Sequence, residues 1–328
     1  DQVKGEVKKL LGIDADESIN QVGISAMCNV VEDVNSDDGI IAIYYAEGEI
    51  VQMAPGGMLN NSTNIVSKNI CRNLEDLKND DDIKAVVLRI NSPGGDAYAS
   101  DQIWHQVTEL RKKKPVVVSM GDYAASGGYY MSCGANWIVA QPNTLTGSIG
   151  IFGVFPDLSG LVTEKLGVKF DEVKTNANSA FGNIAARPFN AAEMAMLQGY
   201  VNRGYATFLN RVSQGRKMSV ENIDKIAQGR VWLGTDALKI KLIDQLGGIK
   251  EAVEKAAQLA KVKNYAVEEY PTTEKWQDQI FNNIVPRGTL DDQLRLALGA
   301  AYEPFMLIRN INQREAIQAR LPMDLNIR

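Results

Sequence analysis

The chain is poor in the residues that build several common kinds of site. It has only one histidine, His105, so a Ser-His-Asp triad has a single possible base. Its three cysteines lie far apart and form no C-x-x-C pair, which gives no disulfide framework. We therefore expect isolated buried thiols, and the sequence indicates no metal ion and no other cofactor.

Positive charge is also scarce. The 35 Lys and Arg residues are outnumbered by 40 Asp and Glu, which gives a net charge of -5 and a pI near 5.2. A nucleic-acid-binding protein needs a basic face, so this balance argues against one. With 45% apolar and 23% charged residues, the 328-residue chain has ample material for a core. Its length allows one large or two medium domains.

The chain has no apolar run long enough to span a bilayer. It starts at Asp1 rather than Met, and no signal-peptide pattern follows. We expect a fragment or a processed form, so the sequence excludes neither an anchor nor an upstream domain.

Short runs of β-branched residues alternate with longer amphipathic segments. The pattern predicts strands over residues 39–46, 84–90, 115–120, 137–140 and 168–173. It predicts helices over residues 4–11, 62–79, 97–113, 123–134, 191–213, 220–227 and 248–263. Such alternation favours an α/β fold of repeated βαβ units around a mostly parallel sheet. We expect a lead-in over 1–38, a core domain over 39–265 and a peripheral helical C-terminal extension over 266–328.

Two glycine-rich turns each follow a predicted strand and open a predicted helix. The first includes Gly94 and Gly95, and consecutive glycines let the backbone bend sharply and present peptide N–H groups. The second places Ser126 before Gly127 at the start of a helix. Sites in parallel sheets lie at the carboxyl ends of strands, so the two turns should meet there. A hydroxyl beside two backbone donors is the minimum arrangement for acyl transfer.

Each turn has a plainer explanation when taken alone. A Pro-Gly-Gly sequence is common in tight turns, and Ser126 could be an ordinary helix N-cap. The order of the turns and the strand before each favour the catalytic interpretation of Ser126.

The base that would activate Ser126 is not evident. His105 falls off the apolar stripe of its predicted helix, which indicates a solvated position. A catalytic lysine must be neutral, and Lys174 is the best local candidate. However, Asp171 and Glu172 would favour its charged form. No lysine is an obvious partner.

Several runs of the sequence resemble the signal peptide peptidase A (protease IV) family, and the resemblance extends over residues 39–263. The runs are 91–95, 114–120, 124–129, 145–153 and 224–232, followed by Gly234 and the pair Gly247 and Gly248. The resemblance implies a crotonase/ClpP-like core. More narrowly, the chain resembles the second half of the long tandem-repeat form, in which the first copy supplies the lysine base. Short forms carry that lysine in a turn that corresponds here to residues 175–183, which contain none.

The resemblance also implies roles for single residues. Ser126 matches the nucleophile of a Ser/Lys dyad, and Gly95 and Gly127 match the oxyanion donors, with Gly94 shaping the first turn. Ser148 matches the hydroxyl that orients the lysine, and its plainer alternative is a buried turn hydroxyl.

The family cuts signal peptides already released from preproteins, on the outer face of the cytoplasmic membrane. The resemblance therefore implies a serine peptidase whose catalytic domain lies on the periplasmic side of the inner membrane. Its expected substrates are signal-peptide fragments and other short apolar peptides. Its expected partners are the N-terminal half of the same protein and further copies in a homo-oligomer. We expect Ala124, Ala125 and the loop 53–61 to help shape an apolar groove. Two alternatives stay open: a crotonase-type acyl-CoA enzyme, and a non-catalytic peptide-binding scaffold that has lost its base.

Overall fold

The computed structural model describes residues 7–9, 12, 38–53, 64–171, 174–176, 179, 181–182, 184, 186–271 and the backbone of 317–320. The chain divides into two compact units, residues 1–35 and 36–328. In the first unit, residues 7–9 are helical, within the predicted helix 4–11. The elements described below belong to the second unit.

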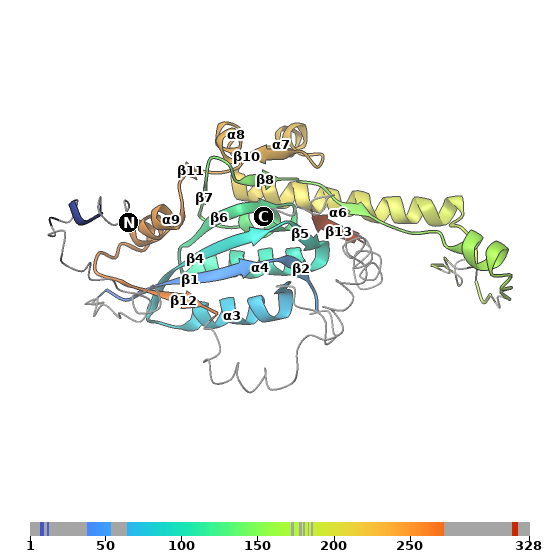
Figure 1. The fold of residues 1–328 in the computed structure, drawn as a ribbon, viewed down its shortest axis with the longest axis horizontal. Helices are drawn as coiled ribbons and strands as arrows, with labels where there is room; N and C mark the ends of the chain where they lie inside the picture. The colour runs from blue at the N-terminus through green and yellow to red at the C-terminus, as the bar shows by residue number, and fades with distance from the viewer. Residues whose placement is uncertain are drawn as a thin grey trace. The chain divides into compact units, whose positions relative to one another are not determined.

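Helices cover a large sheet in the second unit, and a smaller sheet lies beside it (Figure 1). The strands are β1 (Ile40–Glu47), β2 (Glu49–Val51), β3 (Asn64–Val66), β4 (Ile83–Ser92), β5 (Gly94–Asp96), β6 (Val116–Ala125), β7 (Trp137–Ala140), β8 (Leu145–Gly147), β9 (Phe152–Gly153), β10 (Val231–Leu233), β11 (Gln245–Leu246), β12 (Ala266–Tyr270) and β13 (Ile317–Arg320). The helices are α3 (Ser67–Asn79), α4 (Ala97–Lys113), α5 (Gly127–Ser132), α6 (Ala191–Arg216), α7 (Val220–Ile226), α8 (Gly234–Lys239), α9 (Ile249–Ala260) and the π-helical turn η1 (Gly160–Lys165).

The large sheet is mostly parallel, which confirms the predicted α/β class. Its strand order is β10-β8-β6-β4-β1-β12, and β7 also pairs with β6 and carries β11. All neighbouring pairs are parallel except β10 with β8. The carboxyl ends of β4, β6 and β8 therefore reach the same edge of the sheet.

The alternation of apolar residues along each strand buries both faces of this sheet. In β1, Ile41 and Ile43 pack in the cluster that includes alanines of α9. Ala42 and Tyr44, which alternate with them along the strand, pack in the cluster that includes residues of α3 and α4. Fully burying one such aliphatic side chain contributes about 1.5–3 kcal/mol, so the two layers anchor the sheet that carries the candidate turns.

The smaller sheet has the order β3-β2-β5-β13-β9 and holds the first glycine turn. Its central strand β5 leads directly into α4. Asp96 caps that helix, because its carboxylate accepts the N–H of Ala99 at 2.6 Å. This cap explains why α4 begins at the predicted residue.

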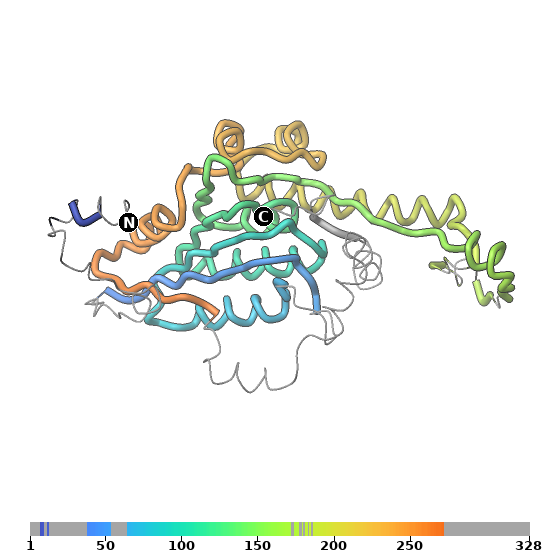
Figure 2. Tube along the Cα trace, viewed as in Figure 1, coloured from blue at the N-terminus to red at the C-terminus, as the bar shows by residue number. Residues whose placement is uncertain are grey.

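Helix α6 connects the core to a projecting segment. The chain runs outward from β9 to η1 and returns along α6 (Figure 2). At the outer end, Glu193 accepts bonds from Arg187 and from the N–H of Asn190, and these hold the pKa of its carboxyl at about 2. At the inner end, Phe208 stacks on Tyr130 with ring centroids 4.4 Å apart. None of the helices in the described parts combines the length and apolar character needed to cross a membrane.

Three predicted elements differ from the structure near the core. The helix predicted from residue 62 begins at Ser67, because residues 64–66 pair with β2 as β3. The helix predicted from residue 123 begins at Gly127, because β6 continues to Ala125 to pair with β8. Residues 168–171 were predicted as part of a strand but form none. Their apolar residues favour a strand, yet they pair with no other strand in the described structure.

The predicted helical extension over 266–328 is wrong where the structure describes it. Residues 266–270 form β12 and pair in parallel with β1, and 317–320 form β13. Val267 and Tyr270 are strand-forming residues, and the free edge of β1 gives them a partner. The other residues of this extension, and the loop 54–61, lie outside the described residues.

A largely buried ion pair, with side chains 8% and 21% exposed, fixes the inner end of α6 to the large sheet. Arg216 donates to both carboxylate oxygens of Asp244, at 2.9 and 2.7 Å. Asp244 also accepts the N–H of Ile138 in β7 at 2.8 Å. Burial and this pairing both act on Arg216, and the net effect raises its pKa.

We predict that Asp244→Asn destabilises the protein by about 3 kcal/mol, because it leaves a buried guanidinium without its counter-charge. Asp236→Asn is the matched control, since its pair with Lys239 is exposed, and should cost about 1 kcal/mol or less. Urea denaturation followed by circular dichroism measures both. Equal midpoints for the two variants would contradict the prediction.

Candidate active site

The carboxyl ends of three neighbouring strands bring the candidate residues together. Ser92, the last residue of β4, pairs with Ala124 of β6. One residue further along, Ala125 pairs with Gly147, the last residue of β8. Ser126 and Ser148 directly follow that pair, and the N–H of Ser126 donates to the carbonyl of Gly147, which forms the peptide bond to Ser148. The structure thus places Ser148 next to Ser126.

Ser126 sits in a sharp bend between β6 and α5. Its backbone has φ 53° and ψ -111°, a conformation that L-residues rarely adopt. Two bonds hold it there: its N–H donates to the carbonyl of Gly147 at 2.8 Å, and its own carbonyl accepts the N–H of Tyr130 at 2.7 Å. The side chain makes no capping hydrogen bond. Ser126 thus occupies the N-cap position of α5, as the plainer alternative expected, but does not make the hydrogen bond of an ordinary serine cap.

The hydroxyl of Ser126 is buried and unpaired. Its side chain is 0% exposed, and Oγ has no hydrogen-bond partner within the described structure. Leaving a buried hydroxyl unsatisfied costs about 1–3 kcal/mol. A buried hydroxyl without a protein partner in a strained bend is a candidate reactive group.

The first glycine turn lies against this bend, as predicted. Gly94 has φ +99°, and its N–H donates to Ser92 Oγ at 3.1 Å. Gly95 packs so closely on β2 that a Cβ atom would overlap the carbonyl oxygen of Ile50. Strand β5 also contacts α5, whose first residue is Gly127. As the first residue of its helix, Gly127 has no intrahelical acceptor for its N–H.

Ser148 borders a separate cavity. Its φ is 48°, and its N–H donates to the carbonyl of Arg230 at 2.7 Å. The cavity has a volume of about 460 Å³ and is lined by Ser148, by Ile151 and Phe152, and by residues of α6 such as Tyr205. A side chain entering from outside could reach Ser148 through this cavity.

The chain itself occupies the edge of β5. Strand β13 pairs antiparallel with β5, with Ala319 opposite Gly95, and its other edge pairs with β9. It also contacts α5. Ser126 is fully buried, and β13 lies against both β5 and α5, the two elements that carry the glycine turns. No sequence signal marked residues 317–320 as a strand.

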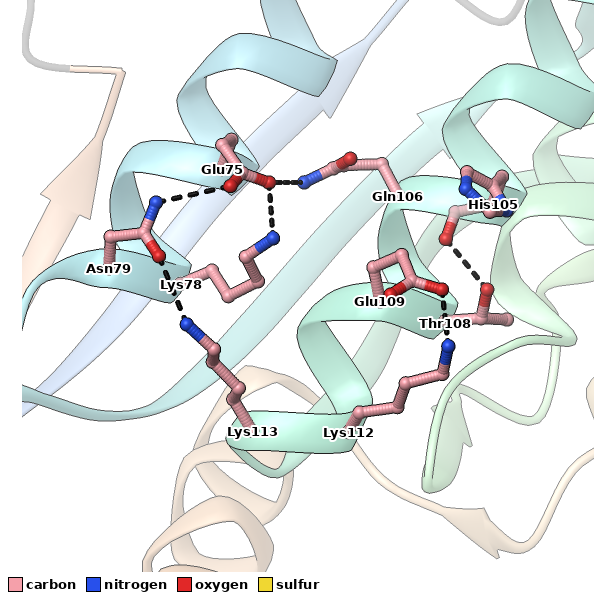
Figure 3. Close-up of polar contacts among 9 residues, drawn as sticks. All are labelled: Glu75, Lys78, Asn79, His105, Gln106, Thr108, Glu109, Lys112 and Lys113. Atoms are coloured by element: carbon pink, nitrogen blue, oxygen red, sulfur yellow. Dashed lines mark hydrogen bonds and ion pairs between the residues drawn. The ribbon is translucent and has the colours of Figure 1, made fainter.

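Neither base considered from the sequence lies beside Ser126. His105 is exposed on α4, where its carbonyl accepts the hydroxyl of Thr108 (Figure 3). It lies eight residues, or about 12 Å, from the start of that helix. Lys174 interacts with Glu193 in the first turn of α6. That turn is 15 residues, or about 22 Å, from Phe208, which stacks on α5.

A third candidate base, the lysine Lys114, stands out only in the structure. Burial lowers the pKa of Lys114, and its ammonium donates to the carbonyl of Leu77 at 2.8 Å. Lys114 precedes β6, and Ser126 follows that ten-residue strand, so about 30 Å separates them. None of these three candidates lies beside Ser126, and Ser126 Oγ has no hydrogen-bond partner among the described residues. The described residues also contain no group of three His, Cys, Asp or Glu side chains that could hold a metal ion.

Sequence reasoning overlooked Ser92. It is buried, bonds the first glycine turn and contacts the second. The signal was its place beside Pro93 in the first glycine motif, although a serine there is common in turns.

Comparisons with known proteins point in one direction. The model of Peptidase family S49 matches residues 108–263, and that of Clp protease matches residues 57–145. The chain is 43% identical over 222 residues to "Protease 4" of Haemophilus influenzae, covering 67% of this chain and 34% of that protein. It is 33% identical over 265 residues to "Serine protease SPPA, chloroplastic" of Arabidopsis thaliana, covering 80% and 39%.

A shorter relative is matched over most of its length. The "Putative signal peptide peptidase SppA" of Enterococcus faecium is 32% identical over 231 residues, covering 68% of this chain and 67% of that protein. The chain thus spans little more than a third of the two longer relatives and about two thirds of the shorter one.

We predict that Ala319→Pro increases the rate at which a fluorophosphonate labels Ser126. Proline has no N–H to donate to β5 or β9, so it should weaken the pairing of β13. Ala319→Val is the matched control, because it keeps the N–H and favours a strand. Intact-protein mass spectrometry over time measures the labelling. Equal rates in both variants would contradict the view that β13 limits access.

Proposed function

The chain belongs to Peptidase family S49, and we propose that it is the part of a serine endopeptidase that carries the nucleophile, Ser126. The observation that carries the proposal is the buried, unpaired hydroxyl of Ser126 in a strained bend. Hydroxyls are normally paired when buried, so an unpaired one beside two glycine turns fits a group that reacts.

The proposed reaction is acyl transfer to Ser126. A neutral base takes the hydroxyl proton as Oγ bonds to the carbonyl carbon of the scissile peptide. The resulting oxyanion accepts hydrogen bonds from the N–H groups of Gly95 and Gly127. The C–N bond then breaks, the leaving amine takes the proton from the base, and water releases the acyl group by the reverse sequence.

We assign the base to a lysine outside this chain, in an N-terminal half of the same protein. The support is that Lys114 and Lys174 lie away from Ser126, that Ser126 Oγ has no hydrogen-bond partner among the described residues, and that residues 175–183 contain no lysine. Ser148 would orient the incoming ammonium, and the cavity that it borders offers a route. A lysine acts as a base only when burial lowers its pKa.

We propose released signal peptides and other short apolar peptides as substrates. A substrate in extended form could pair with β5 as β13 does, and this mode gives affinity through main-chain hydrogen bonds. In this proposal the protein works as a homo-oligomer on the periplasmic side of the inner membrane. The printed name of the Enterococcus relative supports the substrate class.

A non-catalytic scaffold is the second candidate, and the absence of a base among the described residues favours it. A serine-directed probe separates the two. Labelling of Ser126 when the N-terminal half is present supports the enzyme, whereas labelling neither with nor without that half supports the scaffold.

We predict that Ser126→Ala in the full natural polypeptide lowers kcat/KM for an apolar peptide ester at least about 10³-fold, because no other hydroxyl replaces the nucleophile. His105→Ala is the matched control and should stay within about twofold of the original activity, since His105 is solvent-exposed. Initial rates over a range of ester concentrations measure both. Turnover unchanged by Ser126→Ala would remove Ser126 from the mechanism.

A further inference from the structure

Ser92 is buried where the two glycine turns meet. It is the last residue of β4 and is 0% exposed. The pairing of β4 with β6 shifts register between Ile90 and Ser92, so Ser92 lies opposite Ala124. Its position is therefore set by the end of one strand and by the strand that carries Ser126.

The hydroxyl of Ser92 fixes the first turn. Its oxygen accepts the N–H of Gly94 at 3.1 Å, across the intervening Pro93, which has no N–H of its own. Gly94 is itself buried and has φ +99°. This bond orients the peptide plane before Gly94 and so sets the direction in which the chain enters Gly95.

The backbone of Ser92 fixes the second turn. A Cβ atom on Gly128 would lie 2.9 Å from the Ser92 carbonyl oxygen and 3.4 Å from the Ser92 Cβ. The start of α5 is thus packed directly on Ser92. Gly127 is the preceding residue, so its N–H is held at a set distance from the same point.

The neighbouring Asn91 supports this arrangement from the other side. Its side-chain oxygen accepts the N–H of Tyr123 at 3.4 Å, and its carbonyl accepts the N–H of Gly48 at 3.0 Å. Residues 91 and 92 together therefore tie β4 to β6 and to the start of β2. Ser92 is the member of this pair that touches both glycine turns.

We propose that Ser92 is a positioning residue that sets the spacing between the two oxyanion donors, Gly95 and Gly127. The inference rests on the proposed function, because it concerns the same site. Ser92 does not touch the reacting atoms in this view. It acts through the Gly94 N–H on one side and through the packing of Gly128 on the other.

The test is a set of buried-serine variants in the full natural polypeptide. Losing one oxyanion donor lowers kcat about 10²- to 10³-fold, so displacing one through Ser92→Ala should lower kcat about 10- to 100-fold. KM for the peptide ester should change by less than about twofold, because the donors act on the transition state. Ser92→Thr keeps the hydroxyl and should recover most of kcat.

Ser132→Ala is the matched control. It removes another fully buried hydroxyl from the same region, one that bonds the carbonyl of Gly128 at 2.6 Å. A purely structural effect would lower the melting temperature of both variants and leave kcat of the folded fraction unchanged. A peptide aldehyde, which forms a tetrahedral adduct, should bind Ser92→Ala more weakly by the same factor as kcat falls.

The outcomes separate this inference from the proposed function. If the unmodified protein neither turns over the ester nor is labelled at Ser126, the proposed function fails. If it is active and Ser92→Ala matches Ser132→Ala in kcat and in aldehyde affinity, only the inference on Ser92 is overturned. Should Ser92→Ala not fold, Ser92→Cys provides a weaker acceptor and should give an intermediate kcat at unchanged KM. An unchanged kcat with Ser92→Cys would then overturn it.

Discussion

The site depends on the alignment of three parallel strand ends. Because Ser126 donates its N–H to Gly147, the end of β8 holds the bend that follows β6. Because Ser92 pairs with Ala124, the end of β4 lies level with that bend. A shift of one residue in either register would turn the hydroxyl away from the glycine turns. The buried layers on both faces of the sheet make such a shift costly, since each aliphatic side chain would leave its cluster.

The same alignment explains why glycine is needed in both turns. At Gly95 the smaller sheet approaches so closely that its neighbour in β2 leaves no room for a side chain. At Gly128 the first turn of α5 rests on the end of β4. Larger residues at these positions would keep the two turns apart. The short distance between the turns therefore requires glycine in both of them. The tight bend at Ser126 is stable only because both sides are fixed.

Local sequence information was enough for much of this architecture. Helix α4 has the predicted bounds, because Asp96 caps its start and Lys114 precedes the next strand. The strands of the core, Ser126 and the glycine turns were also predictable, since runs of β-branched residues and glycine pairs carry strong local signals. The predictions that were wrong concerned segments whose structure depends on pairing with a distant strand. Residues 266–270 form a strand by pairing with the edge of β1, and residues 317–320 do so by pairing with β5. The sequence of these segments does not indicate which strand they pair with. The contact of β13 with the two glycine turns depends on such a distant pairing, so no local signal predicted it.

The burial of Ser126 also bears on its missing base. A lysine on the surface keeps its charge at neutral pH and cannot take a proton. A lysine brought to Ser126 would lose its hydration in a corner where the serine is 0% exposed, and this loss lowers its pKa. In the proposed mechanism the burial of Ser126 would therefore serve a lysine base as well, since it offers the dry surroundings that such a base requires. Lys114 illustrates the effect elsewhere in the fold, where burial outweighs the nearby Asp80 and Asp81 and lowers its pKa. An arrangement in which the base comes from outside the chain can thus leave the serine unpaired and still supply the environment that activates the base.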